Sequence, residues 1–216
     1  MTALEICTIV SMPFAENTYV VWLSGRSDCL VFDPGLEPDK IAECLDERGL
    51  TVVAILNTHG HGDHIGGNGF LKERFPQAPL IIGVNESELL TDPHANMSAP
   101  FGVPIVSPPA DQLVREGDVV EAAGIRLEVL DVPGHSPGHV VYLYRGSPCV
   151  LFGGDVLFRG SIGRYDFPNA NGRLLLDGIR RKLLTLPPDT VVYSGHGPVT
   201  TIGEEKQSNP FVGIGS

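Results

Sequence analysis

The feature that most constrains this chain is the stretch Thr58-His59-Gly60-His61-Gly62-Asp63-His64, which carries three histidines and one aspartate. It follows an apolar, β-branched run at residues 52–56, which is typical of a buried strand. His59 and His61 are two residues apart, so in an extended segment they project to the same side and can hold one metal ion. Asp63 and His64 fall where a helix is expected to begin and point in different directions. The stretch therefore predicts a metal site with two sets of ligands at a strand end, in a fold of the α/β class.

The length and charge of the chain narrow the classes of protein that it can be. Its 216 residues suit one domain with a substantial core, spanning residues 1–216. The formal net charge of −11 repels polyphosphates, which argues against a nucleic-acid partner. No stretch approaches the roughly 18 apolar residues of a membrane span, so no membrane partner is expected. The composition does not indicate an oligomeric state.

The cysteines and the first residues indicate the compartment. Cys7, Cys29, Cys44 and Cys149 are far apart and form no CxxC pair, which favours buried free thiols in a reducing environment. Residues 1–10 lack a basic segment followed by a long apolar run, so they do not resemble a secretion signal. We therefore expect a cytoplasmic protein.

The hydrophobic pattern predicts an alternation of strands and helices. Strands are expected at residues 4–10, 18–23, 29–33, 51–56, 80–84, 119–122, 125–132, 140–144, 149–152 and 190–193. Helices are expected at residues 38–48, closed by Gly49, at 64–75, at 85–90 with Asn85 as the N-cap, and at 171–186. The first three strands form an antiparallel meander, and the next helix and strand continue it as a βαβ unit. Residues 91–110 are expected to form an irregular loop that is a candidate lid and carries a surface histidine, His94.

Further polar residues follow other predicted strands. Asp33 ends the third strand, where it is either a turn former or a carboxylate that orients the metal loop. His135, Asp155 and His196 each follow a short strand inside a glycine-containing turn, a position suited to completing a metal site. His139 begins a strand and is expected to be a packing or supporting residue rather than a ligand.

Four motifs occur in a fixed order, namely THGHGDH, PGHSPGH, GGDVLF and SGHGP, and together they resemble the metallo-β-lactamase superfamily over nearly the whole chain. The resemblance implies a single-domain, four-layer αββα sandwich with a dinuclear site. It implies that one metal is held by His59, His61 and His135, the other by Asp63, His64 and His196, and that Asp155 bridges them. Asp63 and Asp155 are then the carboxylates expected to act in catalysis. Two divalent ions are expected, zinc first, with iron or manganese as alternatives.

Within that superfamily, residues 154–167 and the closing segment GHGPVTTIGEEKQSNPF are similar to the short bacterial branch of hydroxyacylglutathione hydrolases, or glyoxalase II. Because the sequence stops soon after Phe211, we expect it to lack the long helical C-terminal domain of typical glyoxalase II proteins, which leaves glutathione recognition open. The resemblance implies hydrolysis of a small anionic thioester, S-(2-hydroxyacyl)glutathione, by a hydroxide that bridges two metals. Arg159, Arg164 and Tyr165 lie just beyond Asp155 and are the candidate substrate-binding residues. For both arginines, a salt bridge with Asp166 or another acidic neighbour is an equal alternative.

Other functions are compatible with the same ligands. A persulfide dioxygenase would use one iron held by His59, His61 and His135 or Asp155, whereas retention of Asp63, His64 and His196 together, in the GHGP context, favours two metals. Hydrolysis of lactones or other esters, β-lactams or phosphodiesters stays open, although the acidic charge argues against nucleases. A non-catalytic scaffold would have lost ligands, and here none is missing. Ser136 and Ser194 lack the context of a nucleophilic serine.

Overall fold

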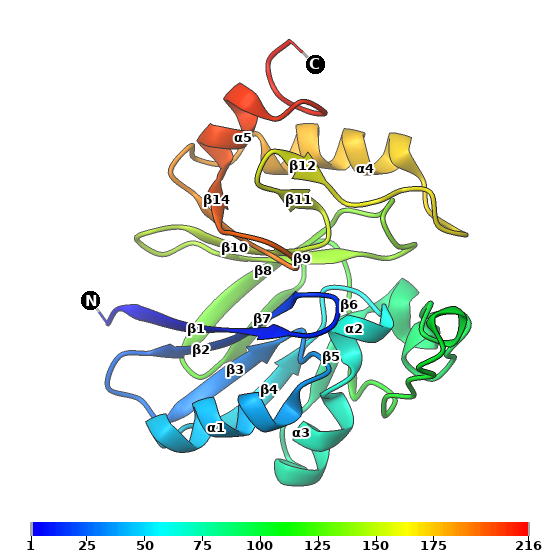
Figure 1. Ribbon diagram of the computed structural model, residues 1–216. Coiled ribbons are helices and arrows are strands. Elements are labelled where there is room, and N and C mark those ends of the chain that lie inside the picture. Colours follow the sequence, from blue (N-terminus) through cyan, green and yellow to red (C-terminus); the bar gives the residue numbers. More distant parts are fainter. Residues whose placement is uncertain (1, 216) are drawn as a thin grey trace. The chain divides into compact units, whose positions relative to one another are not determined.

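A computed structural model describes residues 2–215, and the chain divides into two compact units. Unit 1 contains residues 2–114 and Glu121–Ile125, and unit 2 contains Arg115–Val120 and residues 126–215. Unit 1 is built on one six-stranded sheet, and unit 2 carries most of a second one (Figure 1). No helix among residues 2–215 is long and apolar enough to cross a membrane.

The sheet of unit 1 has its strands in sequence order. They are β1 (Leu4–Ser11), β2 (Glu16–Leu23), β3 (Asp28–Phe32), β4 (Thr51–Leu56), β5 (Leu80–Gly83) and β6 (Gln112–Val114). The first three are antiparallel and the last three continue parallel to β3, so the predicted meander and βαβ unit are confirmed. Helix α1 (Pro38–Arg48) connects β3 to β4 and ends, as predicted, at Gly49 with a left-handed φ of 62°.

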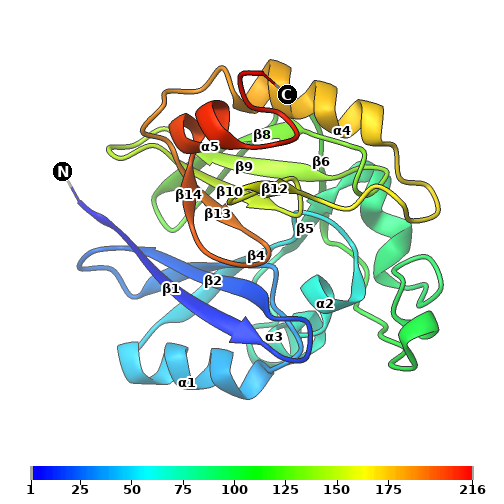
Figure 2. The ribbon, with the colours of Figure 1, turned by 45° about the horizontal axis from the view of Figure 1, so that its top comes forward.

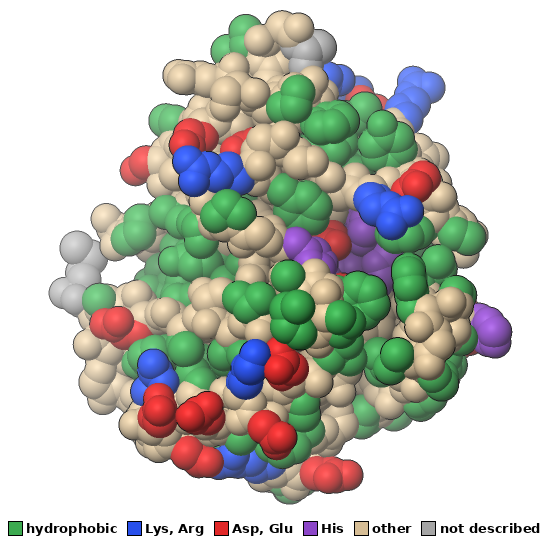
Figure 3. Space-filling model, viewed as in Figure 1, with side chains coloured by type: hydrophobic (Ala, Val, Ile, Leu, Met, Phe, Trp, Pro, Cys, Tyr) green, Lys and Arg blue, Asp and Glu red, His purple; other side chains and the backbone are tan. Residues whose placement is uncertain are grey.

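Helix α1 is amphipathic and packs on one face of this sheet. Its apolar residues Ile41, Cys44 and Leu45 join a buried cluster with strand residues such as Val31 and Ile55. Helices α2 (Gly62–Ile65) and α3 (Asn68–Arg74) contribute Ile65 and Leu71 to the same cluster. Acidic side chains gather over the outer side of α1 (Figure 3). The alternation of apolar and charged positions therefore decides which side of the helix meets the sheet.

Replacing Leu45 with alanine is expected to lower the free energy of unfolding by about 2–5 kcal/mol, because Leu45 is fully buried and its removal leaves a cavity. Chemical denaturation of the two proteins measures the difference. Glu47→Ala on the exposed side of the same helix is the control and should change stability by less than about 0.5 kcal/mol. Equal stabilities for wild type and Leu45→Ala would mean that α1 does not pack as described.

The sheet of unit 2 has the order β14-β13-β10-β9-β8-β7. Its strands are β7 (Val119–Ala122), β8 (Ile125–Asp131), β9 (Val140–Tyr144), β10 (Val150–Gly154), β13 (Val191–Ser194) and β14 (Thr200–Thr201). A two-stranded sheet of β11 (Leu157–Phe158) and β12 (Ser161–Ile162) follows β10. Helix α4 (Gly172–Gly178), the π-helical turn η3 (Ile179–Leu183) and α5 (Ile202–Ser208) bury Leu175, Ile179 and Ile202 against strand residues such as Leu151 (Figure 2).

Some predicted boundaries are wrong, and the structure shows the physical reasons. The helix expected at residues 64–75 is broken into α2 and α3 at Gly66-Gly67, where Gly67 N donates to Pro34 O and a Cβ would lie 2.9 Å from Gly35 O. Asn85 is not an N-cap, because the 3-10 helix η1 (Val84–Leu90) already begins one residue earlier. The strand expected at residues 190–193 is followed by β14 and α5, which the sequence pattern does not predict. Residues 91–110 form the expected loop, with one 3-10 turn, η2 (Ala99–Phe101).

Candidate metal centre

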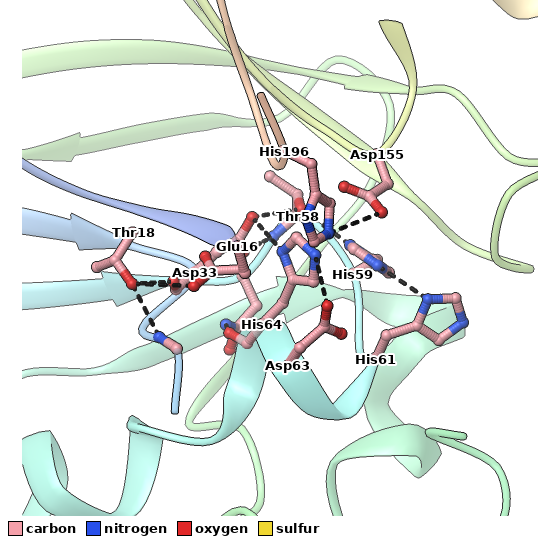
Figure 4. Close-up of polar contacts among 12 residues, drawn as sticks. Glu16, Thr18, Asp33, Thr58, His59, His61, Asp63, His64, Asp155 and His196 are labelled. Carbon is pink, nitrogen blue, oxygen red and sulfur yellow. Dashed lines mark hydrogen bonds and ion pairs between the residues drawn. The ribbon is translucent and has the colours of Figure 1, made fainter. Parts of the chain in front are cut away.

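In unit 1, Asp33 anchors the loop that carries the predicted ligands. Its Oδ1 accepts a hydrogen bond from Thr58 N and its Oδ2 accepts one from Thr58 Oγ1, both at 2.7 Å (Figure 4). Asp33 is buried and its φ is 45°, in the left-handed region that aspartate tolerates in turns. Of the two roles open to Asp33, the structure therefore shows the carboxylate that orients the metal loop.

This anchoring determines which histidine nitrogens face a cation. Thr58 Oγ1 gives its proton to Asp33, so it accepts from His59 Nδ1 at 3.1 Å. His64 Nδ1 lies 3.2 Å from Asp33 Oδ2 and donates to that carboxylate. Both rings thus carry their proton on Nδ1, and their Nε2 lone pairs are the ones available to a metal.

The four ligand candidates of unit 1 form two pairs. His59 Nε2 lies 3.0 Å from His61 Nδ1, and His64 Nε2 lies 3.8 Å from Asp63 Oδ2. His59 and His64 are fully buried and His61 is nearly so. The His59 and His64 rings also lie against each other, with centroids 4.2 Å apart, so the two pairs are adjacent and their division into two ligand sets stays a prediction.

The glycines of the ligand loop allow residues 84–98 to pack closely against it. Gly60 N donates to Glu86 Oε2 at 2.8 Å, and a Cβ at Gly60 would lie 2.5 Å from Leu89 Cβ. Gly62 N donates to Asn96 O at 2.9 Å. Glu86 is fully buried, and the sequence analysis missed it because a single glutamate in a short helical segment carries no signal.

In unit 2, the three remaining ligand candidates meet at one carboxylate. Asp155 Oδ2 lies 3.5 Å from His135 Nε2 and 3.5 Å from His196 Nε2 (Figure 4 draws the second contact). His135 Nδ1 donates to Arg164 O at 2.8 Å, which again leaves Nε2 for a cation. His139 Nε2 accepts from Asp155 N at 3.1 Å, so His139 holds the backbone of Asp155 and has the supporting contact that the sequence predicted.

Gly163 is a further residue that the sequence analysis missed. A Cβ there would overlap the backbone oxygen of Asp155 and would lie 3.2 Å from His135 Nδ1. Gly163 N also donates to Val156 O at 3.2 Å. The segment that follows Asp155 therefore folds back onto Asp155 and His135. Only a glycine at position 163 leaves room for this close approach.

The candidate substrate-binding residues lie in ion pairs or packing contacts. Arg164 donates to both oxygens of Asp166, at 2.9 and 3.0 Å, and its guanidinium lies 4.3 Å from the centre of the Phe167 ring. Hydrogen bonds from Arg164 hold the pKa of the Asp166 carboxyl below its ordinary value. Arg159 pairs with Glu204 at 3.4 Å. The salt-bridge alternative for both arginines is thus observed, and their role toward substrate stays a prediction.

Tyr165 is half-exposed, and its ring packs closely on Gly172. A Cβ at Gly172 would lie 2.7 Å from Cδ2 of the Tyr165 ring. Gly172 is the first residue of α4, so Tyr165 covers the start of that helix. Its contact with substrate also stays a prediction.

The chain can be compared with known proteins on this basis. The profile described as "Metallo-beta-lactamase superfamily" matches residues 12–196. The chain belongs to the metallo-β-lactamase superfamily. Among curated members, "Probable metallo-hydrolase YqgX" of Bacillus subtilis is 42% identical over 93% of both chains. "Hydroxyacylglutathione hydrolase GloC" of Haemophilus influenzae is 37% identical over 92% of this chain and 93% of its own.

Solved structures of superfamily members confirm the predicted fold class. The BLEG-1 B3 metallo-beta-lactamase superposes with a TM-score of 0.92 and 40% identity, covering 96% of this chain and 99% of its own. TTHA1623, solved in a di-iron-bound form, superposes with a TM-score of 0.83 and 38% identity, covering 95% and 99%. The mixed α/β chain with two major sheets has the metallo-β-lactamase sandwich fold of this superfamily of metal-dependent enzymes.

The donor set fits the divalent metals of this superfamily. Imidazole nitrogens and carboxylate oxygens suit zinc, iron and manganese, and four such candidates lie in unit 1 and three in unit 2. No cysteine belongs to the candidate metal-binding groups that the described residues form.

Asp33→Asn is expected to weaken metal binding by about 10- to 100-fold, because the amide keeps only one acceptor oxygen and its NH2 group cannot accept, so the hydrogen bonds from Thr58 and His64 cannot all be kept. Competition with a chromogenic chelator measures the affinity. Asp28→Asn is the matched control at the first residue of β3, where the carboxylate pairs with Arg26 at the surface, and it should bind metal like wild type. Unchanged affinity in Asp33→Asn would refute the anchoring role.

Proposed function

We propose that this protein is a metal-dependent thioester hydrolase and that S-(2-hydroxyacyl)glutathione is its substrate class. The observation that carries the proposal is the position of Asp155, whose Oδ2 lies at equal distance from His135 and His196. A carboxylate in this position can bind two cations, one shared with His135 and the other shared with His196. The 37% identity to a protein named hydroxyacylglutathione hydrolase, over nearly the whole of both chains, supports the choice of substrate.

We assign the ligands in two sets joined by Asp155. His59, His61 and His135 would hold one ion, and Asp63, His64 and His196 the other. When bound, two divalent ions supply Lewis acidity for the thioester carbonyl and lower the pKa of a coordinated water toward neutrality. We propose zinc, with iron as the alternative, because a relative of 38% identity is described in a di-iron-bound form.

The chain's own residues orient this chemistry. Thr58 Oγ1, the Asp33 carboxylate and Arg164 O hold the His59, His64 and His135 rings by Nδ1, and His139 holds the backbone of Asp155. Asp63 and Asp155 would place their negative charge beside the ions that polarise the reacting carbonyl. Ser194 does not act as a nucleophile, since its hydroxyl donates to Leu157 O at 2.7 Å. A thioester suits a site without a strong general acid, because a thiolate leaves without protonation.

The state of the cysteines supports a reducing compartment, so we propose that the protein works in the cytoplasm. All four thiols are free. Cys44 is buried, and burial raises its pKa to about 12, which keeps it unreactive.

The test is thiol release from S-lactoylglutathione by protein loaded with zinc or with iron, run anaerobically and in air. The proposal expects thiol release in both atmospheres without oxygen uptake. Oxygen consumption with glutathione persulfide by the iron form alone would indicate a dioxygenase instead. Hydrolysis of a penicillin but not of the thioester would favour the activity after which the BLEG-1 B3 metallo-beta-lactamase is named.

A further inference from the structure

Two loops of unit 1 expose large apolar side chains that meet each other. The β1–β2 turn exposes Met12 and Phe14, and the loop at residues 101–106 exposes Phe101, Val103 and Val106, with exposed fractions from 38% for Phe14 to 65% for Val106. The Phe14 and Phe101 rings pack edge to face, with centroids 5.6 Å apart. We call these five residues the apolar rim. Exposed aromatic residues that pack across two distant segments are typical of a binding surface.

The sheet of unit 1 places the β1–β2 turn at the same edge as the ligand loop. Because β1 and β2 are antiparallel, β2 and β3 are antiparallel, and β3 and β4 are parallel, this turn lies where β3 and β4 end. Asp33 and the histidine loop follow those two strand ends. Ser11, beside the turn, lies close to Gly35: a Cβ at Gly35 would lie 2.5 Å from Ser11 Oγ. Figure 2 shows the tip of β1 beside α2.

The second loop is attached directly to the ligand loop. Gly62, between His61 and Asp63, donates its N–H to Asn96 O, and a Cβ at Gly62 would lie 2.7 Å from Ser98 Cβ. Asn68 Nδ2 donates to Ser107 Oγ at 2.9 Å. Figure 1 draws this segment as the green loop to the right of α2. In the same view, Figure 3 shows hydrophobic side chains gathered over it. The apolar rim is therefore fixed to the segment that carries His61 and Asp63.

The charges favour an apolar occupant. None of the five rim residues can carry a charge, and the two arginines considered for substrate carboxylates in unit 2 are already paired with Glu204 and Asp166. A hydrocarbon group on the rim would bury apolar surface without removing a charge from water.

We propose that the apolar rim binds the hydrocarbon part of the acyl group, so that the protein favours thioesters with longer aliphatic or aromatic acyl chains over the lactoyl thioester. This inference rests on the proposed function. Each methylene that is fully removed from water strengthens binding by about three- to fourfold. Phe101 and Phe14 are then specificity-determining residues.

The test measures kcat/KM of the zinc-loaded protein for glutathione thioesters of lactate, 2-hydroxybutyrate, 2-hydroxyhexanoate and mandelate. From lactoyl to 2-hydroxyhexanoyl, which adds three methylenes, wild type should gain on the order of 30-fold. In Phe101→Ala this gain should fall below about threefold, and Phe101→Leu should restore most of it, since leucine keeps the apolar surface. Leu113→Ala, an exposed apolar residue on β6 outside the rim, is the control and should keep the full gain.

A binding readout separates this inference from the proposed function. The Kd of the non-hydrolysable thioether analogues of the same series is measured by calorimetry on wild type and Phe101→Ala. Suppose that wild type hydrolyses no thioester, but that its Kd for the thioether analogues still falls with acyl chain length and that Phe101→Ala abolishes this fall. The proposed function would then be wrong, and the binding role of the apolar rim would be supported. Equal chain-length dependence in both proteins, or none in wild type, would overturn the rim.

Discussion

Replacing Asp155 with alanine is expected to lower thioester turnover by at least about 1,000-fold, which corresponds to about 4 kcal/mol of transition-state stabilisation. Asp155 Oδ2 faces both His135 and His196 at 3.5 Å, so its loss weakens both proposed ligand sets at once. The same variant should bind less than the wild-type amount of metal. Steady-state kinetics and elemental analysis on one preparation give the two quantities.

Asp189→Ala is the matched control for this experiment, because Asp189 is an exposed carboxylate of the same unit, just before β13. It should keep wild-type turnover and metal content. Should Asp155→Ala retain both metals and full activity, the carboxylate would have no bridging role and the ligand assignment would have to be abandoned.

Gly163→Ala is expected to lower turnover by at least about 100-fold although Gly163 is itself no ligand. The added Cβ would overlap Asp155 O and crowd His135 Nδ1 at 3.2 Å, so the segment must move away from both ligands. The hydrogen bond from His135 Nδ1 to Arg164 O would be lost with that movement, and with it the orientation of the ring. Metal titration should show weakened binding in parallel.

Gly153→Ala tests whether any glycine substitution near Asp155 has this effect. A Cβ at Gly153 would lie 3.5 Å from Val192 Cγ1, which is ordinary van der Waals contact. This variant should therefore keep activity and metal binding. If Gly163→Ala behaved like Gly153→Ala, the close approach of residue 163 to Asp155 would not matter for function.

The sequence predicted the ligand loop well because its information is local. Spacing alone placed His59 with His61, and the structure has that contact and one between His64 and Asp63. The strand at residues 51–56 was predicted with its exact bounds, because a buried strand has a continuous apolar run. The four-layer fold and the grouping of distant loops are expectations that rest on resemblance, not on periodicity.

What the sequence did not predict depends on contacts between distant segments. The break at Gly66-Gly67 depends on the turn after Asp33, more than 30 positions earlier. Glu86 and Gly163 act through packing that no local pattern reveals. The two roles of Asp33 could not be separated until its hydrogen bonds to Thr58 were seen. Elements of two or three residues, such as β6, β11 and β14, are too short for a hydrophobic period.

The central claim, that seven side chains hold two catalytic ions, is tested most directly by metal titration. Apo protein prepared with a chelator is titrated with zinc while release of thiol from S-lactoylglutathione is recorded. We expect no activity without metal and full activity at two zinc ions per chain. Full activity of the metal-free protein, or a plateau in metal binding at one ion per chain with maximal activity, would contradict the claim.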